Sequence, residues 1–144
     1  MRAVSGNIEI NVIVFAEENE RLWSYRDMFY EIREKKPYRI EVTLTKFLST
    51  FVNVASFLQG GVDLFCFMKQ TDGEVLDRLR ALAKEQERAC LALYEKGYLF
   101  WEYYQEKERI GAERLVVHDG EELCNTMERL CDYMVEARQS LISE

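Results

Sequence analysis

The sequence predicts an α/β domain with a doubly wound, five-stranded parallel sheet and helices on both faces, in three layers. Strand-like and helix-like segments alternate five times along the chain. The middle strand, Val62–Met68, is almost wholly apolar, which is typical of a central parallel strand covered on both faces. No linker or repeat divides the chain, so residues 1–144 are expected to form a single domain with one core.

The first half of the chain alternates between the two periodicities. Ile8–Phe15 is a β-branched run of strand length. Apolar residues then recur at helical spacing over Leu22–Ile32. Tyr38–Thr45 alternates as a second strand, and a short helix is expected at about Thr50–Gln59, before the third strand.

The second half predicts two more strands and three more helices. A helix should run from a turn at Gly73 to about Gln86, followed by a fourth short strand at Ala89–Tyr94. Tyr98–Arg109 is rich in aromatic residues and is expected to be helical. Arg114–Val117 is the expected fifth strand, and Glu121–Leu141 a long closing helix with an apolar stripe.

Charge and composition narrow the classes of partner. The formal net charge is −7, and an acidic surface repels phosphate backbones, so nucleic acid is not expected to bind. No apolar stretch approaches the roughly 20 residues of a membrane span, and the N-terminus lacks the features of a signal peptide. We therefore expect a cytoplasmic domain without membrane contact. The four cysteines form no CxxC pair and are expected to be reduced, buried thiols; they are Cys66, Cys90, Cys124 and Cys131.

Two stretches in this order resemble the receiver domain of response regulators. VDLFCFM followed by TDGEVLDRLRAL resembles the receiver's third strand, Asp-Gly turn and third helix. IGAERLVVHDGEEL resembles the stretch from a Gly-Ala pair through the fifth strand to the last helix. The resemblance covers nearly the whole chain, and it implies a flavodoxin-like (βα)5 fold and a role in two-component signal transduction.

The residues that carry receiver chemistry are mostly missing. Receivers phosphorylate an Asp at the end of the third strand, next to two acids that hold Mg²⁺. Carried over, the acid pair maps to Glu17 and Glu18 (or Ala16 and Glu17), the acceptor to Met68, the hydroxyl position to Tyr94 and the Lys position to His118. Met68 has no nucleophilic oxygen, so the resemblance implies a pseudo-receiver with a degenerate phosphorylation pocket. We expect no catalytic residue, no metal site and no cofactor.

An aromatic segment is the candidate interaction surface. Helical winding cannot bury all of its members, which are Tyr98, Phe100, Trp101, Tyr103 and Tyr104. In receivers the corresponding surface of the fourth helix, fifth strand and fifth helix pairs domains, so a protein partner or a homodimer is expected there. The other reading is that several of these residues cover the sheet as ordinary core.

The expected function is a phosphorylation-independent regulatory module that acts through protein contacts. One alternative is a small-molecule sensor that uses the vacated pocket, where Met68 would otherwise fill space. Another is a small enzyme at the carboxyl edge of the parallel sheet. Because the chain has neither a glycine-rich phosphate loop nor an evident nucleophile–base pair, we do not expect an enzyme.

Overall fold

The computed structural model describes residues 8–16, 19–46, 61–68, 73–95 and 97–143. In chain order the elements are β1 (Glu9–Ala16), α1 (Asn19–Glu34), β2 (Arg39–Lys46), β3 (Leu64–Phe67), α3 (Gly73–Glu85), β4 (Arg88–Glu95), β5 (Tyr98–Gln105), β6 (Glu108–Val116) and α4 (Gly120–Ser143). The helix expected at Thr50–Gln59 lies outside these residues.

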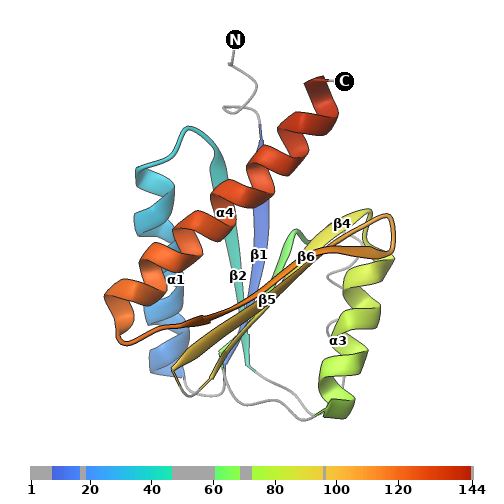
Figure 1. The fold of residues 1–144 in the computed structure, drawn as a ribbon. Helices are drawn as coiled ribbons and strands as arrows, with labels where there is room; N and C mark the ends of the chain where they lie inside the picture. Colours follow the sequence, from blue (N-terminus) through green and yellow to red (C-terminus); the bar gives the residue numbers. More distant parts are fainter. Residues whose placement is uncertain (1–7, 17–18, 47–60, 69–72, 96, 144) are drawn as a thin grey trace.

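The strands form one six-stranded mixed sheet in the order β2-β1-β3-β4-β5-β6 (Figure 1). β1 pairs in parallel with β2 and β3, and β3 pairs in parallel with β4. β5 and β6 then extend the sheet in antiparallel fashion. The prediction of a doubly wound, five-stranded parallel sheet is therefore wrong. Tyr98–Arg109 is not a helix: it forms β5, a turn and the start of β6.

Short connections explain why the last two strands run antiparallel. Two residues separate β4 from β5 and two separate β5 from β6, and a parallel crossover needs a dozen or more. Gly97 after β4 has φ 82°. Glu106 and Lys107, between β5 and β6, have φ 52° and 71°, so both occupy the left-handed region that a two-residue hairpin turn requires.

Helices cover both faces of the sheet. α1 and α4 pack on one face, where Ile10, Val12 and Val14 of β1 point (Figure 1). α3 packs on the other face, where Ile13 and Phe15 point. This alternation along β1 follows from the two-residue period of a strand.

Ion pairs and hydrogen bonds fix one flank of α4 to the neighbouring elements. Lys36 Nζ lies 2.8 Å from Glu128 Oε2 and 2.9 Å from Asp132 Oδ2. The hydroxyl of Tyr38 donates to Asp132 Oδ1 at 2.7 Å. Hydrogen bonds to Glu128 and Asp132 raise the pKa of Lys36, so it stays charged. Farther along α4, Arg138 Nη1 donates to a carbonyl oxygen of β1 at 2.8 Å.

A buried carboxylate joins the β5–β6 hairpin to α3. The side chain of Glu102 is 0% exposed. Arg80 of α3 donates to its two oxygens through Nε at 2.8 Å and Nη2 at 3.0 Å. The Tyr104 hydroxyl donates at 2.8 Å and Arg109 Nη1 at 3.1 Å. Burial alone would raise the pKa of Glu102, but these hydrogen bonds and the charge of Arg80 lower it.

The four cysteines are free, as the sequence predicted, but only three of them are buried, because Cys124 is partly exposed. Burial raises the pKa of Cys66, Cys90 and Cys131. These three side chains therefore behave as small apolar groups of the core. Among the described residues, none of the helices combines the length and the apolar composition needed to cross a membrane.

We predict that Lys107→Gly raises the free energy of unfolding by about 0.5–1 kcal/mol, because glycine has no Cβ to oppose the left-handed conformation. Gly97→Ala is the matched reverse change, since Gly97 also has positive φ, and it should lower stability by a similar amount. Urea unfolding of both variants measures the effect. If both substitutions changed the free energy of unfolding in the same direction, the left-handed conformation of these two turn residues would be contradicted.

We predict that Glu102→Gln lowers the free energy of unfolding at pH 7 by about 2–4 kcal/mol, because an amide leaves Arg80 and Arg109 without their anionic acceptor. The folded-state pKa of Glu102 lies below its usual value. Its stabilisation is therefore present above the unfolded pKa, near about 4.3, and is lost as the pH falls through the lower folded value. The difference in the free energy of unfolding between wild type and variant should become smaller in that pH range. A difference that stays constant from neutral to acidic pH would refute the role of the charge.

Candidate functional site

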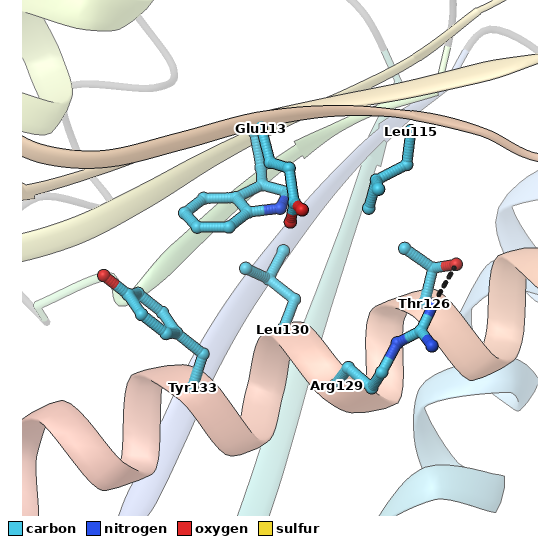
Figure 2. A pocket seen from close by; sticks show the side chains of 7 residues that line it. Glu113, Leu115, Thr126, Arg129, Leu130 and Tyr133 are labelled. Atoms are coloured by element: carbon cyan, nitrogen blue, oxygen red, sulfur yellow. Dashed lines mark hydrogen bonds between the residues drawn. The ribbon is translucent and has the colours of Figure 1, made fainter.

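A groove lies between the β5–β6 end of the sheet and α4 (Figure 2). Its volume is about 420 Å³, within the range of small-ligand and side-chain pockets. The sheet contributes Trp101, Glu113 and Leu115, and α4 contributes Thr126, Arg129, Leu130 and Tyr133.

Strand register and helical spacing bring these side chains together. Trp101 of β5 is the cross-strand partner of Glu113 of β6, so both point to the face that α4 covers. On α4, Thr126, Leu130 and Tyr133 are four and three residues apart and lie along one flank. This flank faces the sheet edge, while the flank with Asp132 is tied to Lys36 and Tyr38.

Aromatic rings form one end of the groove. The ring centroids of Trp101 and Tyr133 lie 5.2 Å apart with the planes at 47°. Tyr133 also meets Tyr103 edge to face, with centroids 5.4 Å apart. Gly111 of β6 permits this arrangement, because a Cβ there would lie 2.7 Å from the Tyr133 hydroxyl and 3.3 Å from Trp101 Cζ3. Burial raises the pKa of Tyr133, so its hydroxyl stays protonated.

Two opposite charges stand on the two walls. Glu113 projects from the sheet and Arg129 from the helix, and both are exposed. Arg129 Nη2 donates to Thr126 Oγ1 at 3.4 Å, which holds the guanidinium near that residue. Figure 2 shows Arg129 and Leu115 on one side of the groove and Tyr133 on the other.

The free edge of β6 runs beside the groove. Among the described residues β6 pairs only with β5. The Val117 amide donates to the Gly97 carbonyl at 2.7 Å. In an antiparallel ladder every second residue bonds to the same neighbour, so the backbone groups of Leu115 and Glu113 also face β5. The amides and carbonyls of Ala112, Arg114 and Val116 consequently point outward. Val116 is 57% exposed, and Ile110, at a register shift opposite Tyr103 and Tyr104, is 51% exposed.

A second cavity, of about 240 Å³, lies at the amino edge of the parallel strands. It is lined by residues that include Glu9, Asn11, Asp63, Arg88 and Arg138. Burial raises the pKa of Asp63, although the backbone N–H of Asn11 donates to its carboxylate at 2.8 Å and Arg138 Nη1 lies 3.5 Å away. Because these polar groups largely bind one another, the cavity is a weaker candidate than the groove.

Of the residues mapped to the phosphorylation pocket, the structure brings Met68 and Tyr94 side by side, because they follow the register partners Phe67 and Leu93, and it places His118 elsewhere. Glu17 and Glu18 lie outside the described residues. Met68 is buried after β3, where its amide donates to the Phe15 carbonyl, and Tyr94 is half-buried in β4. His118 is exposed and its ring lies 2.9 Å from Glu122. Because β6 is three strands from β3, about 14 Å at the usual spacing, His118 and Met68 do not meet.

The aromatic segment is mostly core. Trp101, Tyr103 and Tyr104 are buried, Phe100 is half-buried and Tyr98 is 40% exposed. Of the five, Trp101 alone lines the groove, so the reading as ordinary core applies to most of the segment.

The sequence interpretation missed the other residues of the groove. The spacing of Thr126, Leu130 and Tyr133 was a usable signal for a second flank of α4, but only the sheet order shows what this flank faces. Within the described part of the chain, no three His, Cys, Asp or Glu side chains lie close enough to hold a metal ion.

No protein-family model, curated protein or solved structure matches this chain.

We predict that Gly111→Ala displaces the Tyr133 hydroxyl and lowers the free energy of unfolding by about 1–3 kcal/mol, because the added methyl group overpacks this end of the groove. Gly120→Ala is the matched control, since no atom lies within 4 Å of a Cβ built there. Thermal unfolding and the indole NMR signal of Trp101 measure the two effects. An unchanged Trp101 signal in Gly111→Ala would contradict the close approach.

Proposed function

We propose that this domain is a non-catalytic protein-interaction module that binds an extended segment of a partner protein as an added strand on β6. The observation that carries the proposal is the outer edge of the nine-residue strand β6, which no strand of the described residues covers and which lies next to a groove. Outward backbone groups supply hydrogen bonds in such complexes, and an adjacent groove selects side chains. The module would need no phosphotransfer.

The geometry of a strand fits the groove. An added strand lies about 4.8 Å from its neighbour and turns every second side chain to the same face. Alternate side chains of the partner would therefore point to the face of Glu113 and Leu115, toward α4. The outward amides and carbonyls of Ala112, Arg114 and Val116 would pair with its backbone.

The charges of β6 favour a different protein over a second copy of this chain. In a two-fold symmetric pairing of two β6 strands, the central residue faces its own copy. A centre at Glu113 or Arg114 places like charges opposite each other, which destabilises the pair. A centre at Leu115 lies near the end of β6, so only about three residues of each strand would pair. A centre at Gly111 meets the register shift between Gly111 and Arg109, which interrupts a regular ladder. Two copies that each carry a net charge of −7 also repel each other, so a homodimer through this edge is the less favoured occupant.

We further propose that the module is cytoplasmic. In support of this, Cys66, Cys90 and Cys131 are free and buried, which is the state that cysteines keep in a reducing compartment.

We predict that peptides selected from a displayed library of random 12-residue sequences bind Ala112→Pro at least about tenfold more weakly than wild type, because proline removes an outward amide donor. Ala112→Val is the matched control: it keeps the amide and suits a strand, so affinity should change little. Fluorescence anisotropy of labelled peptides measures binding.

A second experiment uses only wild-type protein, so its result does not depend on whether the proline variant folds. Wild-type protein is titrated with the selected peptide carrying one N-methylated residue at each position in turn, and alternating positions should lose binding. Equal affinity for all three proteins, or a loss without alternation, would show that the peptide does not add as a strand.

A further inference from the structure

We propose that the groove receives a cationic side chain, lysine or arginine, of the partner segment at the end formed by Trp101, Tyr133 and Glu113. This inference rests on the proposed strand addition and names the chemistry that the groove selects. Three observations support it: two aromatic rings set at an angle, a carboxylate on the adjoining strand and the acidic charge of the chain.

The first observation is the aromatic corner. Trp101 and Tyr133 approach to 5.2 Å with their planes at 47°, so their ring faces are not stacked on each other. Both residues line the groove, and Trp101 is 9% exposed. Ring faces carry the negative part of the aromatic quadrupole and attract ammonium and guanidinium groups. Burial keeps the Tyr133 hydroxyl neutral, so it adds no negative charge of its own.

The second observation is the position of Glu113. Its register partner is Trp101, so its carboxylate lies over the same part of the sheet face (Figure 2). A cation at the aromatic corner would meet this carboxylate and two ring faces together. The formal net charge of −7 adds long-range attraction for a basic segment and speeds its encounter with the domain.

The groove also contains a positive charge, which determines where along β6 the basic residue of the partner segment can lie. The guanidinium of Arg129 is turned toward Thr126 and away from Tyr133 (Figure 2). This group disfavours a cation at that end and favours a neutral or acidic side chain. Since partner residues two apart are about 6.8 Å apart along a strand, the two ends accept different residues of one segment. Gly111 lets the Tyr133 ring approach β6, and this ring forms the inner boundary of the aromatic end of the groove.

The peptide library tests this specificity. Peptides selected on wild type should share one lysine or arginine, and its replacement by norleucine should weaken binding about 5- to 30-fold, the range expected for a partly desolvated cation–π contact. Glu113→Gln should weaken the same peptides by a similar factor. Glu108→Gln removes the same charge from the same strand outside the groove and should change affinity less than about twofold.

The outcomes separate the two proposals. Peptides that lose binding to Ala112→Pro but share no basic residue, or that ignore Glu113→Gln, would leave strand addition in place and overturn the cationic specificity. Peptides that bind Ala112→Pro as well as wild type would overturn the proposed function itself.

A small probe tests the aromatic corner without any peptide. Choline and its neutral analogue 3,3-dimethylbutan-1-ol have nearly the same shape, so a cation–π site distinguishes them by charge. We expect choline to shift the indole NMR signal of Trp101 saturably at millimolar concentration, with a smaller shift from the alcohol. The Trp23 indole is the internal control, because Arg26 already lies 3.9 Å from its ring centroid. Equal shifts from both probes, or no saturable shift of Trp101, would overturn the inference.

Discussion

The carboxylate of Glu102 has no solvent exposure, and it lies where three elements meet. Desolvating a charge costs several kcal/mol, and this cost is recovered only if cationic donors surround it. Arg80 of α3 and Arg109 of β6 supply them, so α3, β5 and β6 must pack together before the charge is stable. The position of β6, and with it the wall of the groove, follows from this requirement.

The groove exists because α4 is held firmly on one flank only. Its contacts with Lys36, Tyr38 and β1 fix the helix over the parallel half of the sheet. The other flank faces the antiparallel hairpin. There Gly111 lets Tyr133 approach β6 closely, and the groove stays open on the side of Arg129. Because α4 is bound on one flank and the sheet extends beyond its other flank, a groove forms between helix and sheet, and no loop of the described residues contributes to it.

The sequence predicted the parallel half well and the hairpin poorly. The β-branched run of β1 and the apolar run of β3 lie close to the expected bounds, because their periodicity is strong. β5 is buried on both faces, so Leu99 to Tyr104 show no alternation that would mark a strand. Its turn, Glu106–Lys107, lacks the glycine or asparagine that signals a hairpin. Trp101 was named as an interaction residue, but Glu113 and Tyr133 depend on a sheet order that sequence did not reveal.

The mixed topology has a consequence for how the chain folds. Strands β4, β5 and β6 are consecutive and joined by two-residue connections, so their contacts close small loops. The pairing of β1 with β3 joins residues about 50 positions apart, such as Val12 and Leu64, and costs more chain entropy. Local pairing favours early formation of the meander. When the whole chain refolds, the edge of β6 would then be exposed before the parallel strands assemble, so the edge proposed to bind a partner would be open to aggregation before the core is complete.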